Sequence, residues 1–88
     1  DNKPAFWINP QLTAINEDWD LVLNDQTKCE LIYMHIPAGS LVMKTDNNPG
    51  LVMRHKPDRI DLCISSETFV DQRSKCDFSR FITKRIKY

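Results

Sequence analysis

Several features that would direct the interpretation of a small chain are missing from this sequence. No uninterrupted apolar run exceeds four of the 88 residues, so no segment has the length of a membrane-spanning helix. Only two glycines occur, Gly39 and Gly50, and a glycine-rich phosphate loop is therefore excluded. Twelve acidic residues balance twelve basic ones, so net charge alone attracts no partner. We expect no contact with a membrane.

Cysteine is scarce, and its arrangement indicates a reducing environment. The three cysteines are Cys29, Cys63 and Cys76, no C-x-x-C pair occurs, and the chain has no N-x-S/T glycosylation acceptor. Small secreted domains stapled by disulfides usually carry an even and denser set. We therefore predict free thiols and a cytoplasmic protein, with one bridge and a spare thiol as the alternative.

Length and composition predict a single small domain over residues 1–88. Apolar residues make up 41% of the chain and charged residues 27%, as in ordinary globular proteins. A body of this size buries roughly 60% of the surface of its unfolded chain, which leaves no room for a deep catalytic cleft. Because the first residue is Asp1 and not methionine, we expect the domain to be part of a larger protein or a processed product.

Apolar alternation predicts an antiparallel meander of about five strands. Residues 1–8 read as an extended arm or an edge strand, and Asn9-Pro10 reads as the cap and first position of a short N-terminal helix. Period-two patterns follow, separated by short turns, and short loops join antiparallel neighbours. The expected strands are 18–23, 28–36, 40–44, 51–55 and 59–64.

The C-terminal segment predicts an amphipathic helix over residues 75–86. Ser74-Lys75-Cys76-Asp77 fits the capping pattern [ST]-x-x-[DE]. Phe78, Phe81, Ile82 and Ile86 then share one helical face. The predicted fold is therefore α+β, with a short N-terminal helix, the meander, and a C-terminal helix packed on one face of the sheet.

Charge is distributed unevenly along the chain. The first 43 residues hold six acids and two bases, whereas the remainder holds ten bases and six acids. The last sixteen residues alone hold six bases and one acid. A neutral protein of this kind carries a strong local field, although a solvated helix face gives the same pattern.

These observations predict a non-enzymatic recognition domain that binds nucleic acid. Basic side chains with an aromatic ring on an open sheet face suit phosphates and stacked bases. The alternative is a protein-interaction or inhibitor module that uses the acidic N-terminal half and binds an oppositely charged protein. The predicted contacts are Tyr33, Lys44, Arg54 and Arg59 on the sheet, and Arg80, Lys84, Arg85 and Lys87 on the helix.

Catalysis is a second alternative. Cys76 at the start of the predicted helix, near Arg73 and Lys75, would gain reactivity from the cations and the helix dipole. Pro57-Asp58 with Asp71-x-Arg73 faintly resembles the paired carboxylates and base of metal-dependent nucleases, but arginine cannot exchange its proton. Neither arrangement outweighs an ordinary thiol or an ordinary turn aspartate.

We predict no metal and no cofactor. The histidines and the nearest cysteines are spaced too loosely for a zinc site. Asp18 and Asp20 share one face of a strand and could hold a hard cation, but a solvated strand face is far more common. The histidines and cysteines concerned are His35, His55, Cys29 and Cys63.

Overall fold

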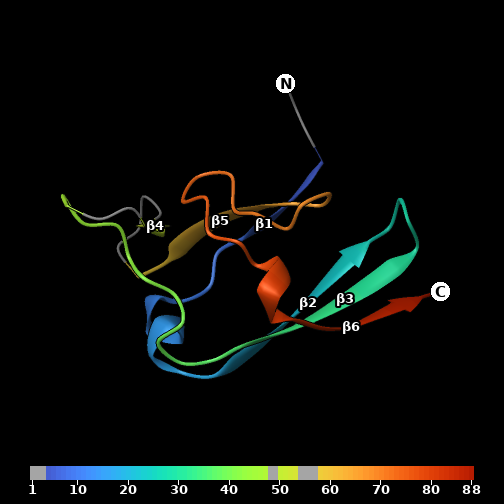
Figure 1. The fold of residues 1–88 in the computed structure, drawn as a ribbon, viewed down its shortest axis with the longest axis horizontal. Coiled ribbons are helices and arrows are strands. Elements are labelled where there is room, and N and C mark those ends of the chain that lie inside the picture. Colours follow the sequence, from blue (N-terminus) through green and yellow to red (C-terminus); the bar gives the residue numbers. More distant parts are fainter. Residues whose placement is uncertain (1–3, 48–49, 54–57) are drawn as a thin grey trace.

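The computed structural model describes residues 4–47, 50–53 and 58–88. Within these ranges the chain forms six strands and two short 3-10 turns, arranged as two three-stranded antiparallel sheets (Figure 1). No helical segment in these ranges is long and apolar enough to cross a membrane. The elements are β1 (Ala5–Ile8), η1 (Leu12–Asn16), β2 (Trp19–Asp25), β3 (Glu30–Ile36), β4 (Val52–Met53), β5 (Ile60–Ser65), η2 (Ser79–Phe81) and β6 (Ile82–Lys87).

Each sheet combines strands that are distant in sequence. One sheet has the order β1-β5-β4 and the other the order β2-β3-β6. In the first, Ala5 pairs with Ser65 at the start of β1. In the second, β2 and β3 form a hairpin, and Glu30 on β3 pairs with Lys87 on β6. The central strands are therefore β5 and β3, and β6 is an edge strand.

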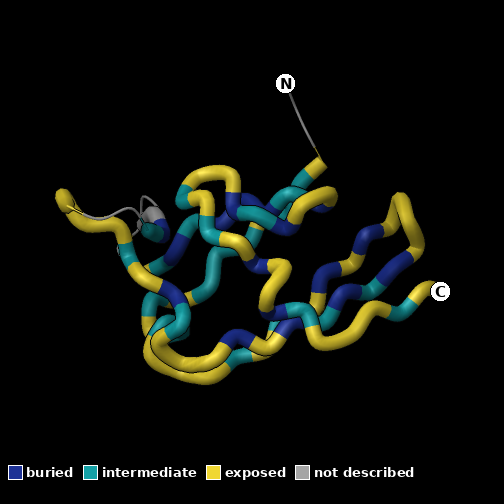
Figure 2. The backbone as a smooth tube through the Cα atoms, in the orientation of Figure 1, coloured by how far each residue is buried: buried dark blue, intermediate teal, exposed yellow. Residues whose placement is uncertain are grey.

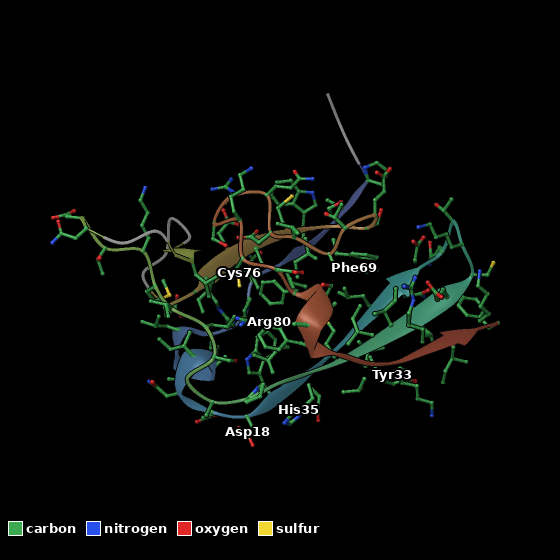
Figure 3. All side chains as sticks on the ribbon, viewed as in Figure 1. Asp18, Tyr33, His35, Phe69, Cys76 and Arg80 are labelled. Atoms are coloured by element: carbon green, nitrogen blue, oxygen red, sulfur yellow. The ribbon has the colours of Figure 1, made fainter. Side chains whose placement is uncertain are left out.

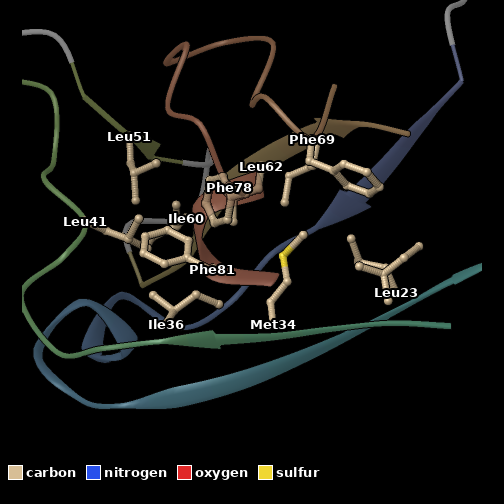
Figure 4. Close-up of a cluster of buried hydrophobic side chains, with 12 residues drawn as sticks. Leu23, Met34, Ile36, Leu41, Leu51, Ile60, Leu62, Phe69, Phe78 and Phe81 are labelled. Carbon is tan, nitrogen blue, oxygen red and sulfur yellow. The ribbon is translucent and has the colours of Figure 1, made fainter. Parts of the chain in front are cut away.

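The hydrophobic core lies between the two sheets (Figure 4). The alternating positions of β3 and β5 that the sequence assigned to the core are buried, and Figure 2 shows the alternation along β3. In β5 the intervening Cys63, which alternation predicted to face outward, is buried as well. Phe78 and Phe81 fill the space between the sheets and meet edge to face at 5.7 Å. Burial of one such ring contributes about 1.5–3 kcal/mol. The residues that confirm the predicted core faces are Ile32, Met34, Ile36, Ile60, Leu62 and Ile64.

The predicted C-terminal helix over residues 75–86 is wrong. Strand β6 begins at Ile82 within this segment and pairs with β3, and the only helical part of the segment is the 3-10 turn η2. The β-branched side chains of Ile82, Thr83 and Ile86 favour a pleated strand over a helix. The backbone of β3 supplies the hydrogen-bonding partners that the segment lacks on its own, so tertiary pairing decides the outcome.

The apparent capping motif before this segment has another role. The hydroxyl of Ser74 donates to the carboxylate of Asp71 at 2.5 Å. The carboxylate of Asp77 accepts bonds from the amide and the hydroxyl of Ser79 at 2.9 and 2.6 Å. Short polar side chains often bond to nearby backbone in this way outside helices. The motif therefore fixes a loop and the entry to η2.

The predicted N-terminal helix is also wrong, because residues Leu12–Asn16 form only the 3-10 turn η1. Asn9 does not act as its cap. Its side-chain amide donates to the carbonyl of Ile60 at 3.3 Å and to the carboxylate of Asp61 at 3.2 Å. Asn9 therefore ties the end of β1 to β5. With no true helix in the described residues, the α+β assignment is replaced by a two-sheet β architecture.

The predicted meander is wrong as well, since the strands form two sheets and each sheet pairs strands that are not consecutive in sequence, β1 with β5 and β3 with β6. The expected strand over residues 40–44 is reduced to an isolated bridge between Met43 and Leu51, which is parallel. Gly50 permits this approach. A Cβ atom there would lie 2.7 Å from the carbonyl carbon of Met43 and 2.8 Å from the amide nitrogen of Lys44, and closer still to the carbonyl oxygen of Val42.

Candidate nucleic-acid interface

One face of the sheet β2-β3-β6 is turned away from the core, and we call it the outer face. Its central strand presents Leu31, Tyr33 and His35, because the alternate residues of β3 are buried. Figure 3 shows Tyr33 and His35 on this side. Val22 on β2 is 51% exposed and lies opposite Tyr33. The outer face is therefore an accessible surface that mixes aromatic, aliphatic and charged groups.

Tyr33 and Lys84 form the centre of the candidate interface. They are cross-strand partners between β3 and β6. The ammonium nitrogen of Lys84 lies 5.9 Å from the centroid of the Tyr33 ring, within the range of a cation–π contact. Alternation along β6 also places Ile86 on the outer face beside Leu31. The predicted aromatic residue and one predicted cation therefore meet.

Arg85 points to the opposite side of β6 and is bound to a carboxylate. Its guanidinium donates to Glu30 at 2.6 Å and lies 5.3 Å from the centroid of the Phe69 ring. The hydrogen bond from Arg85 lowers the pKa of Glu30, and the same bond raises the pKa of Arg85. Lys87 follows Arg85 by two residues on β6, is exposed, and pairs with Glu30 of β3, so it projects from the same side of the sheet as Arg85. Of these two cations, Lys87 is the more available to a phosphate.

Arg80 lies in η2, immediately before β6, and already has partners. Its guanidinium donates to the carbonyl of Ser40 at 3.1 Å and stacks 4.6 Å from the centroid of the Phe81 ring. Figure 3 shows it near Cys76. Arg80 therefore links η2 to the segment after β3. Arg80 nevertheless remains exposed to solvent.

Two of the other predicted contacts, Lys44 and Arg59, are not part of this surface. Lys44 lies in the segment that bridges to Leu51, at the opposite end of the molecule from β6 (Figure 1). Arg59 precedes β5 and forms a bridge with Gln11 in the other half of the fold. Arg54 lies outside the described residues. The structure thus gathers five of the eight predicted residues around β3, η2 and β6. Tyr33 lies on a strand as predicted, whereas the other four lie on a 3-10 turn and a strand where the sequence predicted a helix.

Tyr88 belongs to the outer face and was missed by the sequence prediction. It is 63% exposed, and its hydroxyl donates to the side-chain oxygen of Asn24 on β2 at 2.7 Å. Its amide donates to the carbonyl of Cys29 at 2.9 Å. The period-two relation to Lys84 and Ile86 would have identified it had residues 82–87 been assigned as a strand.

The outer face is acidic where β2 begins, and we call this part the β2 end. The ring nitrogen Nδ1 of His35 lies 2.8 Å from a carboxylate oxygen of Asp20, and Nε2 lies 4.0 Å from Asp18. Asp18 also accepts a hydrogen bond from the amide of Ala38 at 2.7 Å. Among the described residues no group of three or more side chains is arranged to hold a metal ion. His55 lies outside the described residues.

Cys76, the thiol considered for the catalytic alternative, lies in an environment that does not activate it. Burial raises the pKa of the Cys76 thiol and outweighs the opposing effect of Arg80. Burial likewise raises the pKa of Cys63. All three cysteines are free thiols, and Cys29 is exposed. A raised pKa reduces the thiolate fraction at neutral pH, so neither Cys63 nor the partly buried Cys76 has the character of an activated nucleophile.

The two carboxylates of the nuclease-like pattern have different surroundings. Asp71 is fully buried and accepts hydrogen bonds from the amide of Cys63 and from Ser74. Asp58 lines a surface hollow of about 450 Å³ near η1. Asp58 precedes β5, whereas Asp71 is bound to Cys63 within that strand, five positions farther along the chain. Arg73 is paired with Asp61 at 2.8 Å. The pattern forms no paired-carboxylate site.

Comparison with known proteins does not identify this chain. No family model, no curated protein and no solved structure matches it.

Proposed function

We propose that the chain is a non-enzymatic recognition domain that contacts nucleic acid along β6 and the adjoining outer face. The observation that carries the proposal is the contact between Lys84 and the partly exposed ring of Tyr33. Lysine neutralises backbone phosphate, and a tyrosine ring offers a surface for a base. Lys87 adds positive charge on the other side of the same edge strand, where it lies opposite Glu30.

The available cations are expected to contribute unequally. Lys84 and Lys87 form no ion pair with a carboxylate among the described residues, whereas Arg85 is bound to Glu30. Transfer of Arg85 to a phosphate would leave the carboxylate of Glu30 buried without its partner, which is costly. We therefore assign phosphate binding to Lys84 and Lys87, and a structural role to Arg85.

A salt titration tests the proposal. Fluorescence anisotropy of labelled 15-nucleotide single strands and duplexes is measured from low to physiological salt. Each phosphate contact adds about 0.7 to 0.9 to the slope of log affinity against log salt. Lys84→Gln and Lys87→Gln should each reduce the slope by about that amount, whereas the matched control Lys44→Gln should leave it unchanged. The proposal fails if neither oligonucleotide binds at low salt, or if the control weakens binding as much as the β6 variants.

The β2 end of the outer face supports a second candidate, a protein-docking module. Asp20 has a side chain 79% exposed, and Val22 two residues later is 51% exposed. Acidic groups beside an exposed aliphatic side chain suit a basic protein surface with an apolar centre. Binding of a protein partner that survives Lys84→Glu but is lost in Asp20→Lys would favour this candidate over the nucleic-acid proposal.

A further inference from the structure

We propose that the outer face binds a single-stranded nucleic acid, with one base stacked on Tyr33 and a second on Tyr88. This inference rests on the proposed function and names its substrate class. It depends on the aromatic rings, whereas the proposed function depends on the cations.

Tyr88 is held in place across the sheet. It follows β6, but its hydroxyl bonds to Asn24 on β2, on the far side of the central strand β3. Its amide bonds to Cys29 at the start of β3. The ring is therefore anchored at both ends while 63% of the residue stays exposed. An aromatic ring that is already positioned loses little conformational freedom when a ligand stacks on it.

Tyr33 provides the second ring, in the middle of the same face. Lys84 covers part of it at 5.9 Å. The lysine side chain is long and flexible, so it can swing to a phosphate and leave the ring free for a base. The ammonium group then lies next to both the stacked base and the backbone that follows it, as in many single-strand binding surfaces.

Two separately held rings select an unstacked strand. The backbones of Lys84, which faces Tyr33, and of Tyr88 lie four residues apart, about 13 Å in a β-strand, and the Tyr88 side chain reaches over β3 to Asn24, the partner of Leu31. Successive bases of one duplex strand are only about 3.4 Å apart. In a duplex both faces of each base are covered by its neighbours, so no base is free to stack on a side chain. Only a strand with separated bases can use both rings.

The surface between the rings contains no carboxylate from β3 or β6. Leu31 and Ile86 lie there, and both are partly exposed. The acidic pair formed with His35 lies beyond Tyr33, in the direction away from Tyr88. A strand of nucleic acid that runs from Tyr33 to Tyr88 along β6 therefore avoids Asp20.

The experiment compares a 15-nucleotide oligo(dT) single strand with a duplex of the same length at one salt concentration. We expect the single strand to bind at least tenfold more tightly. Loss of one stacking ring should weaken it by about 5- to 150-fold, so Tyr88→Ala and Tyr33→Leu should each show a loss in that range. Tyr88→Phe keeps the ring but removes the bond to Asn24, and it should show a smaller loss. Circular dichroism establishes that each variant is folded.

The matched control is Trp7→Ala, which removes an aromatic ring that is 66% exposed on the other sheet. It should leave the affinity for oligo(dT) unchanged. Equal binding of single strand and duplex, or unchanged affinity in folded Tyr88→Ala, overturns this inference and leaves the proposed function standing. If neither oligonucleotide binds at low salt, the proposed function fails and this inference fails with it.

Discussion

The carboxylate of Asp71 accepts a hydrogen bond from the backbone amide of Cys63 at 2.8 Å, and both residues are buried. The same carboxylate accepts bonds from the amide and hydroxyl of Ser74 at 3.0 and 2.5 Å. Three donors thus converge on one side chain. Asp71 fastens the loop after β5 onto that strand and holds it in place.

Removal of this carboxylate should be strongly destabilising. Asp71→Ala leaves the buried amide of Cys63 without an acceptor, and we expect a loss of about 2–4 kcal/mol in the free energy of unfolding. Ser74→Ala keeps the bond to Cys63 and should cost only about 1 kcal/mol. Urea unfolding measures both. If Asp71→Ala lost less free energy of unfolding than Ser74→Ala, Asp71 would not hold the loop as described.

Gly50→Ala should disturb the approach of residues 50–51 to residues 42–44. The new Cβ would meet backbone atoms of Met43 and Lys44 at 2.7 and 2.8 Å, and backbone yields less readily than a side chain. We expect a destabilisation of about 1–3 kcal/mol, as for other overpacked sites. Thermal unfolding provides the measurement.

Gly39→Ala is the matched control for this prediction. Nothing lies within 4 Å of a Cβ at that position, but φ is +77°. Its cost should therefore come only from the left-handed backbone, about 1 kcal/mol. Equal unfolding temperatures for Gly50→Ala and wild type would show that the close approach does not constrain the fold.

Glu30 should make stability depend on pH in the acid range. Its folded pKa lies below the ordinary value because of the hydrogen bond from Arg85. The stabilisation is therefore complete above the unfolded pKa of about 4.3 and is lost as pH falls through the folded value. Glu30→Gln should unfold more easily at pH 7 and lose less stability than wild type between pH 5 and pH 2.

Asp77 provides the comparison for the acid range. Its pKa is lowered mainly by the hydroxyl of Ser79. Asp77 therefore also stabilises the fold at neutral pH and less in acid, and this effect persists in Glu30→Gln. Denaturant titrations at several pH values separate the two carboxylates. An acid dependence identical in wild type and Glu30→Gln would refute the role given to the Arg85 pair.

Thiol labelling should distinguish the cysteines. Cys29 is exposed, whereas burial raises the pKa of Cys63 and Cys76. At neutral pH we expect one fast-reacting thiol, which disappears in Cys29→Ser, and two that react chiefly after unfolding. Fast labelling of Cys76 in the folded protein would revive the thiol-enzyme alternative.

Local patterns predicted the strands better than their arrangement. Alternation placed Ile32 and Leu62 correctly in the core, because one buried sheet face imposes a period of two. The helix over residues 75–86 was wrong because a short apolar spacing fits either period until a pairing partner is known. That partner is β3, and the Arg85 side chain bonds to a residue 55 positions earlier. No local pattern encodes such a pairing.

The candidate site was predicted in part for the same reason. Tyr33 was correctly placed on the face opposite the core. Its contact with Lys84 depends on the β3–β6 register and on the irregularity after Tyr33, neither of which the sequence displays. Tyr88 was missed because the segment before it was assigned to the wrong period. The charge pattern identified cations but not which of them, such as Arg85, have internal partners.

The two sheets are interleaved along the chain, and this has a consequence for folding. The hydroxyl of Ser66 bonds to the carbonyl of Pro4 across 62 positions, and the hairpin of the other sheet lies between them in sequence. A cut between residues 37 and 59 yields two fragments, neither of which contains a whole sheet. We therefore expect assembly in one cooperative step, with the slow kinetics of folds dominated by distant pairings.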